Sequence, residues 1–548
     1  MTPLDMPRLA RTLDRVKQRY DVIVVGSGYG GGVTAARLAR AGKRVCVLER
    51  GREIATGEFP LRFPDMRREF RVTGGVVDTG VETALYHISL GADMHVLTGC
   101  GLGGGSLVNA GVALRPDARV FADPVWPDQI RQDEWLDEGF ARAERWLRPM
   151  PDPMAASLNK FKSLDRASAA VGVSPIAPRV AVSFEATRNG AGINQPACTR
   201  CGDCCGGCNV GAKNTVALTY LPAAVAAGAE LFVYARADHV ERLQNGTWKV
   251  VATRLDMPLA GPVAIEADMV VLSAGTLGST GILLRSAERG LALSSSLGAR
   301  FSANGDIVAF GYGARDPVDA IGVGHPAKAD VGPVGAAVSG QIEIRSSDDL
   351  ALELTIQEGT MPSAFAPVLP VMFVPNGRLL GALQSLVSGV YKGPFSRLST
   401  YFAVSHDSAA GRLALVEGRV KLAWPGAGDE PVYKRLDEIL MKLTAEIGGA
   451  YVKNPLAGSL MGHQPATAHP LGGAAMASDR SSGVVDHAGR VFDGRSGAAS
   501  NATLHGLYVV DGSIIPRSLG ANPLLTITAL AERAMIHFGA EHHLSMPD

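Results

Sequence analysis

Residues 21–31 read Asp21-Val22-Ile23-Val24-Val25-Gly26-Ser27-Gly28-Tyr29-Gly30-Gly31. After Asp21 the run to Val25 is continuously apolar, which is typical of a strand buried on both faces of a parallel sheet. An alanine-rich segment from Val33 to Ala39 predicts a helix, and residues 44–49 predict a second strand. This order of strand, glycine-rich turn, helix and strand predicts a βαβ unit.

The glycines at positions 26, 28 and 31 have the spacing of a dinucleotide-binding turn. Gly26 permits the tight turn, Gly28 lets a pyrophosphate approach the backbone, and Gly31 lets the helix pack closely on the strand. Glu49 follows 18 residues after Gly31, where a carboxylate can accept hydrogen bonds from ribose hydroxyls. A loop that served packing alone would not explain Glu49. We therefore predict dinucleotide binding, of either FAD or NAD.

The composition is that of a compact globular protein. The 548 residues include 53 basic and 53 acidic side chains, and 46% of all residues are hydrophobic while 19% are charged. This balance excludes a disordered chain and argues against a nucleic-acid binder, which normally carries a basic surplus. Glycine accounts for 65 residues, well above the usual share of about 7%, so the backbone must approach something closely at many places.

The N-terminal segment bears on location. Residues 1–8 contain no apolar core of a secretory signal, and no run of about eighteen apolar residues occurs in the chain. Apolar residues recur every three or four positions from Leu9 to Tyr20, which predicts a short helix that packs ahead of the first strand or lies on a membrane surface. We expect a cytoplasmic protein with no transmembrane segment, and peripheral membrane contact is left open.

Buried runs far from the first strand predict a sheet assembled from distant parts of the chain. Residues 269–275 and 506–512 resemble the first strand, and a long helix is expected from about Leu525. Residues 341–345, 352–356 and 420–424 instead alternate with period two, as in an antiparallel sheet.

The predicted fold class is therefore an α/β, Rossmann-like dinucleotide-binding domain interleaved with an α+β substrate domain built on an antiparallel sheet. The expected boundaries place the nucleotide domain at 18–120, 226–310 and 461–548, and the substrate domain at 121–225 and 311–460.

A second glycine cluster runs from Cys100 to Asn109, and consecutive glycines let main chain lie close to a ligand. Together with Gly26–Gly31, Ser273-Ala274-Gly275 and a C-terminal block, this cluster resembles the glucose–methanol–choline (GMC) family of FAD-dependent oxidoreductases. The block contains His469-Pro470-Leu471-Gly472-Gly473, Val509-Val510-Asp511-Gly512-Ser513 and Asn522-Pro523. Within the family the chain looks most like the bacterial cholesterol-oxidase branch.

The resemblance implies FAD as the cofactor. Some members tether the flavin through a histidine just before the asparagine of the glycine block, and the chain has Val108 there, so we expect FAD to be bound without a covalent bond. The expected cofactor-binding residues are Gly26, Gly28, Gly31, Glu49, Gly103, Gly104, Ser106, Asn109, Val240, Asp511, Gly512 and Asn522.

The resemblance also implies oxidation of an alcohol, with His469 accepting the hydroxyl proton and Asn522 bonding the substrate oxygen or the flavin edge. Cholesterol oxidases use a buried glutamate to shift a double bond after oxidation, and the surroundings of Glu358 resemble that site. If the strand keeps its alternation, Glu358 shares an apolar face with Leu354 and Ile356, where a carboxylate has a raised pKa. The alternative is that the strand ends earlier and Glu358 is solvated.

Five cysteines crowd between positions 198 and 208. Cys198, Cys201, Cys204 and Cys208 have the spacing of a bacterial ferredoxin-type 4Fe–4S site, although Asn209 replaces the usual proline. The alternatives are reduced thiols in a tight glycine-rich turn, a zinc site or a disulfide.

We expect an FAD enzyme that oxidises the CH–OH group of an apolar, steroid-like 3-hydroxy alcohol to the ketone, with hydride transfer to the flavin. The electron acceptor, either oxygen or a quinone or protein, and a double-bond isomerisation by Glu358 are left open. The first alternative is a dehydrogenase for another alcohol or a sugar, with an iron–sulfur relay to a quinone or protein acceptor. The second is a non-catalytic electron carrier, which has little need of the His469 and Asn522 motifs.

Overall fold

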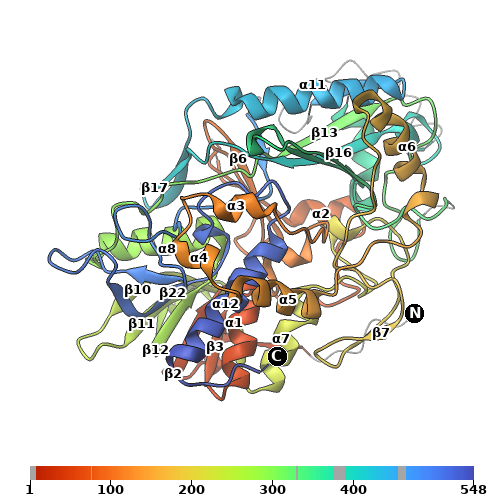
Figure 1. The fold of residues 1–548 in the computed structure, drawn as a ribbon. Helices are drawn as coiled ribbons and strands as arrows, with labels where there is room; N and C mark the ends of the chain where they lie inside the picture. The colour runs from red at the N-terminus through yellow and green to blue at the C-terminus, as the bar shows by residue number, and fades with distance from the viewer. Residues whose placement is uncertain (1–7, 76, 329–330, 374–388, 454–463, 548) are drawn as a thin grey trace.

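The computed structural model describes residues 8–75, 77–328, 331–373, 389–453 and 464–547. Two sheets organise the chain, and each has its own hydrophobic core. Figure 1 shows α11 (Pro431–Glu446) lying along the smaller, antiparallel sheet, while α12 (Leu524–Glu541) lies beside α1 (Tyr29–Arg40) over the larger one.

The larger sheet has nine strands and is mixed. Seven of its strands follow the order β1-β9-β3-β2-β12-β11-β10. The other two lie off this path: β22 pairs with β12, and β21 pairs with β22. The strands β3, β2, β12 and β22 are mutually parallel, whereas β10, β11 and β12 form an antiparallel meander. The bounds are β1 Ala10–Arg11, β2 Arg19–Val25, β3 Val45–Leu48, β9 Glu230–Phe232, β10 Ala235–Arg242, β11 Trp248–Arg254, β12 Pro262–Leu272, β21 Arg490–Phe492 and β22 Thr503–Val509.

The smaller sheet has five antiparallel strands in the order β14-β15-β16-β13-β19. Their bounds are β13 Ile307–Tyr312, β14 Gln341–Ile344, β15 Leu354–Gly359, β16 Ser399–Ser405 and β19 Ala450–Lys453. A four-stranded sheet has the order β20-β6-β5-β4, and two further strand pairs are β17–β18 and β7–β8. These strands are β4 Phe70–Thr73, β5 Tyr86–Ser89, β6 His95–Gly99, β7 Thr187–Arg188, β8 Asn194–Gln195, β17 Arg412–Val416, β18 Arg419–Ala423 and β20 Ala466–Thr467.

Helices cover the larger sheet. The largely buried α12 packs against α1 and α5, and a buried ion pair joins Arg37 of α1 to Glu532 of α12 at 2.7 Å. The other α-helices of the described residues are α2 Phe63–Arg68, α3 Ala118–Ala122, α4 Asp128–Gln132, α5 Trp135–Leu147, α6 Asn159–Ser168, α7 Tyr220–Ala226, α8 Gly275–Glu288 and α9 Leu369–Met372.

The helix expected between Leu9 and Tyr20 is wrong. Residues 10–11 form β1, which pairs with β9 more than two hundred residues away, and only Leu13–Arg15 form a single 3₁₀ turn. None of the helices in the described part of the chain is long and apolar enough to cross a membrane. The cellular location and the domain boundaries stay predictions, and the boundary at residue 460 lies outside the described residues.

Candidate active site

The carboxyl ends of four parallel strands meet at one edge of the larger sheet. Gly26 follows β2, Glu49 follows β3, Ser273 follows β12 and Asp511 comes shortly after β22. In open parallel sheets the ligand binds beyond this edge. The predicted cofactor residues from distant parts of the sequence are therefore gathered at one edge.

The glycines of the turn after β2 have different surroundings. A Cβ atom on Gly26 would lie 2.2 Å from the Ser273 carbonyl oxygen, and one on Gly31 would lie 2.0 Å from the Gly26 oxygen. A Cβ atom on Gly28, the residue that caps α1, would meet nothing within 4 Å. Gly26 and Gly31 are thus required by packing, while Gly28 borders open space beside the unpaired N–H groups of a helix N-terminus.

The second glycine cluster lies against this helix start. A Cβ atom on Gly104 would lie 2.9 Å from the Gly28 Cα atom, and the Gly103 N–H donates to Ser27 Oγ at 3.0 Å. The Ser106 hydroxyl donates to the Gly103 oxygen at 2.6 Å and accepts from the Val216 N–H at 3.0 Å, which holds the turn. Two glycine-rich segments therefore form one backbone surface beside the helix N-terminus, where N–H groups can bind a pyrophosphate.

Glu49 is buried beneath this surface. Its Oε2 accepts from the Ser27 hydroxyl at 2.6 Å, and its Oε1 accepts from the Gly51 N–H at 2.7 Å. A carboxylate has about four acceptor positions, so these bonds leave capacity for a ribose hydroxyl.

Asn109 carries an acceptor that the protein leaves unused. Its Nδ2 donates to the Tyr29 hydroxyl at 2.7 Å, but its buried Oδ1 has no hydrogen-bond partner among the described residues. Buried acceptors are normally paired. A donor on a bound FAD would satisfy this oxygen, so the residues present fit the group.

Two other predicted contacts are occupied by the protein itself. The Val240 N–H, in the middle of β10, donates to Ser286 Oγ at 2.9 Å, which gives no support to an adenine contact through this group. The Asp511 carboxylate accepts from the Gly275 N–H and from Ser279 and Ser513, and burial raises its pKa. Gly512 follows, and its carbonyl oxygen accepts from the Gly472 N–H at 3.0 Å.

His469 is held by a buried carboxylate that sequence reasoning missed. Its Nδ1 lies 2.8 Å from Asp306 Oδ1, while Asp306 Oδ2 accepts from the N–H of His469, from the Ala468 N–H and from the Thr467 hydroxyl. The acceptor-only carboxylate places the proton on Nδ1, so Nε2 carries the free lone pair. This is the arrangement that an imidazole base requires.

Asn522 is held by an amide. Its Oδ1 accepts from Gln357 Nε2 at 2.7 Å, and both side chains are buried. Gln357, on β15, is a second residue that sequence reasoning missed.

One loop joins the two candidate catalytic residues. Asn304 donates through Nδ2 to the Ala521 oxygen at 2.9 Å and accepts from the Leu519 N–H, and Asp306 follows two residues later. Asp407 accepts from the N–H groups of Ala303 and Gly305, and burial raises the pKa of Asp407 to about 6. The loop formed by residues 302–306 thus contacts the segment that contains His469 and the segment that contains Asn522.

The structure does not bring Glu358 to this group. The strand continues to Gly359 and Glu358 is buried, and burial raises its pKa to about 7 against the opposing effect of Lys160. Neighbouring strand residues point to opposite faces, and Gln357 points to Asn522. Glu358 instead accepts from the Ser339 N–H and lies 3.2 Å from Lys160 Nζ of α6.

The cysteine run is a cluster of thiols in which Cys204 is buried and the other four are partly buried. All seven cysteines are free thiols, and Cys198, Cys204, Cys205 and Cys208 pack in one hydrophobic cluster. Burial raises the pKa of Cys198 to about 12 and also raises that of Cys204. Among the residues that the structure describes, no three histidine, cysteine or acidic side chains are placed to hold a metal ion.

Comparison with known proteins places these features in a class. A family model described as GMC oxidoreductase, covering the N-terminal part, matches residues 20–302, and the corresponding C-terminal model matches residues 456–531. These are FAD oxidoreductases that act on alcohols. The chain belongs to the GMC oxidoreductase family.

Known relatives cover nearly the whole chain. A cholesterol oxidase of Mycobacterium tuberculosis (strain CDC 1551 / Oshkosh) is 27% identical, over 95% of this chain and 91% of its own. A long-chain-alcohol oxidase of Arabidopsis thaliana is 25% identical, over 94% of this chain and 66% of its own. The structure of a fungal aryl-alcohol oxidase is similar in fold, with a TM-score of 0.61 at 16% identity, over 96% of this chain and 100% of its own.

Proposed function

We propose that the protein is an FAD-dependent oxidase that converts the CH–OH group of an apolar alcohol to a carbonyl group. The observation that carries this proposal is the His469–Asp306 pair, in which Nδ1 is held at 2.8 Å and Nε2 is left as an acceptor. When bound, FAD supplies the acceptor for the hydride of the alcohol carbon.

The side chains act on the hydroxyl group. Nε2 of His469 accepts the hydroxyl proton, and the Asp306 carboxylate stabilises the imidazolium that results. Nδ2 of Asn522 donates to the same oxygen and so fixes its position. The two glycine segments and Asn109 hold FAD by non-covalent contacts, since Val108 cannot form a bond to the flavin.

We propose a sterol-like 3-hydroxy alcohol as the substrate, with a long-chain alcohol as the alternative. The names of the relatives support both, since one is a cholesterol oxidase and another a long-chain-alcohol oxidase. We further propose that the product is the unrearranged ketone. The residue in contact with Asn522 is an amide, Gln357, which cannot act as the base that moves a double bond, and Glu358 faces away.

Dioxygen is the proposed electron acceptor, because these relatives are named oxidases. The spacing of the cysteines from Cys198 to Cys208 supports a competing proposal, in which an iron–sulfur cluster passes electrons to a quinone or a protein. A 4Fe–4S centre adds a broad visible absorbance to that of the flavin, and iron analysis of anaerobically purified protein tests for it directly.

The test is anaerobic mixing of the purified holoprotein with cholesterol, with a long-chain primary alcohol and with glucose. We expect the sterol to bleach the flavin bands and air to restore them with formation of hydrogen peroxide. His469→Ala should slow the bleaching by about 10²- to 10⁴-fold, and His505→Ala, at an exposed position, should not change it. Bleaching that persists in His469→Ala at the wild-type rate, or a flavin that no alcohol bleaches, would overturn the proposal.

A further inference from the structure

A line of polar side chains runs from Asn522 to the edge of the smaller sheet. Gln357 Nε2 donates to Asn522 Oδ1 at 2.7 Å and to Gln341 Oε1 at 3.3 Å. Gln341 Nε2 in turn donates to Glu343 Oε1 at 2.6 Å. Gln341 and Gln357 are register partners on β14 and β15, and Glu343 lies two residues along β14 on the same face.

The Glu343 carboxylate at the end of the line determines which way each amide group is oriented. An amide can present either its oxygen or its nitrogen to a neighbour, whereas a carboxylate only accepts. Glu343 therefore requires the nitrogen of Gln341, which leaves the oxygen of Gln341 to accept from Gln357. The nitrogen of Gln357 then requires the oxygen of Asn522. Asn522 Nδ2 donates one hydrogen back to Gln357 Oε1 at 3.4 Å, and its second hydrogen is left for another acceptor.

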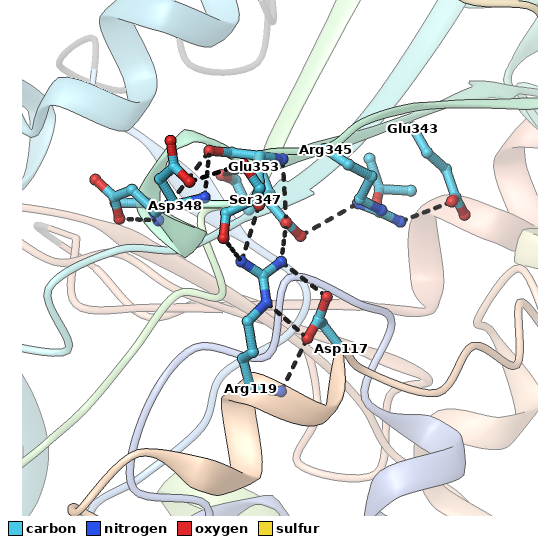
Figure 2. A network of polar contacts seen from close by, with 12 residues as sticks. Asp117, Arg119, Glu343, Arg345, Ser347, Asp348 and Glu353 are labelled. Carbon is cyan, nitrogen blue, oxygen red and sulfur yellow. Dashed lines mark hydrogen bonds and ion pairs between the residues drawn. The ribbon is translucent and has the colours of Figure 1, made fainter.

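A charge network holds Glu343 at the end of the line. Arg345 Nη2 lies 3.0 Å from Glu343 Oε2, and Arg345 Nη1 donates to the Thr355 hydroxyl at 3.1 Å. Arg345 also approaches Glu353, which is bonded to Arg119 (Figure 2). Figure 2 shows the network continuing from Arg119 to Asp117, so that carboxylates and guanidinium groups alternate. The Glu343 carboxylate is thus held between the Gln341 amide and the Arg345 guanidinium.

We propose that Glu343 is a positioning residue that sets the orientation of the Asn522 amide through Gln341 and Gln357. The inference rests on the proposed function, in which Nδ2 of Asn522 donates to the substrate oxygen. Glu343 touches no substrate. It determines which end of a distant amide does.

Two substitutions change the direction of the line without changing its size. Glu343→Gln removes the acceptor-only end, so the Asn522 amide loses its bias and the rate of flavin reduction falls about two- to fivefold at an unchanged KM. Gln357→Glu removes the donor that holds Asn522 Oδ1 and leaves only acceptors against Asn522, so the amide should turn over and place Oδ1 where Nδ2 lies in the wild-type protein. A hydrogen bond to a charged group is worth about 1.5–3 kcal/mol, which corresponds to a loss of about 10- to 150-fold. Asp348→Asn, which removes a charge from a neighbouring loop outside the line, is the matched control and should leave the rate unchanged.

A double-substitution cycle separates positioning from a general loss of structure. Because Glu343 acts only through Asn522, Glu343→Gln should have no further effect in a protein that already carries Asn522→Ala. A slow Asn522→Ala variant with a wild-type rate in Glu343→Gln refutes the positioning role alone. An Asn522→Ala variant as fast as wild type refutes the proposed role of Asn522 and this inference with it.

A structural readout is independent of turnover. A crystal structure of Gln357→Glu at better than about 1.2 Å should show Asn522 Nδ2 in the place that Oδ1 takes in the wild-type protein, within hydrogen-bond distance of the new carboxylate. An Asn522 amide that keeps the wild-type positions of Oδ1 and Nδ2 would overturn the inference.

Discussion

Asp306→Asn should abolish most of the activity while leaving the fold intact. In the protein, Asp306 Oδ2 accepts three hydrogen bonds, from the N–H groups of Ala468 and His469 and from the Thr467 hydroxyl. Those N–H groups can only donate, so the asparagine must keep its oxygen at this position. Its NH₂ group then faces Nδ1 of His469, where Asp306 Oδ1 now lies at 2.8 Å.

The consequence is a reversed tautomer. An NH₂ group donates, so Nδ1 of His469 must accept and the proton moves to Nε2. Nε2 then cannot take the hydroxyl proton of the substrate. Loss of a general base costs about 10²- to 10⁴-fold in rate, or about 3–5 kcal/mol of transition-state stabilisation.

Stopped-flow measurement of flavin reduction under anaerobic conditions checks this prediction, with the visible spectrum and melting temperature recorded to show that FAD and fold are retained. Asp437→Asn serves as a control, because Asp437 accepts from the Tyr451 hydroxyl of the smaller sheet and has no contact with His469. A reduction rate within about threefold of wild type in Asp306→Asn would refute the reasoning, since the tautomer would then have no influence on the proton transfer.

Three further predictions concern the cofactor and stability. Gly28→Ala should fold normally but bind FAD at least about tenfold more weakly, because the added methyl group enters the open space beside the helix N-terminus; equilibrium titration of the apoprotein with FAD measures this. Gly26→Ala should fail to fold, because its Cβ atom would lie 2.2 Å from a carbonyl oxygen. Glu358, whose pKa burial raises from 4.5 to about 7, binds its proton more tightly in the folded state, so unfolding free energy should fall by about 3 kcal/mol as pH rises from about 4.5 to about 7. Denaturant titrations should show Glu358→Gln flattening that slope. Glu532→Gln removes the carboxylate that lies 2.7 Å from the buried Arg37 guanidinium and should cost about 3–5 kcal/mol, measured by the same titrations, and an unchanged midpoint would contradict this.

Sequence reasoning succeeds here where the pattern is local. The glycine turn and the buried strands could be predicted because each depends on residues close together in the sequence, such as Gly26, Gly31 and the run before them. The segment from Leu9 to Tyr20 has a helical spacing, but its structure is decided by the pairing of Ala10 with Leu231. Such non-local pairing leaves no trace in the periodicity of either partner.

In the candidate site, too, local patterns could be predicted from the sequence and contacts between distant residues could not. Alternation along β15 predicts the burial of Glu358, and the structure agrees, but the pattern does not say what each face of the strand meets. Gln357, one residue earlier, is the side chain that reaches Asn522. Asp306 gives only one local signal, the turn-forming Asn304-Gly305 pair before it, and its partner His469 is 163 residues away.

The loop that contains Asp306 connects the candidate catalytic residues to both sheets. It leads into β13 of the smaller sheet, and Asn304 bonds the chain just before Asn522, which in turn precedes α12 on the larger sheet. Gln357 holds Asn522 from the smaller sheet as well. The distance between His469 and Asn522 therefore depends on how the two hydrophobic cores pack, and a substitution that shifts one core against the other should lower the rate of alcohol oxidation without touching either residue.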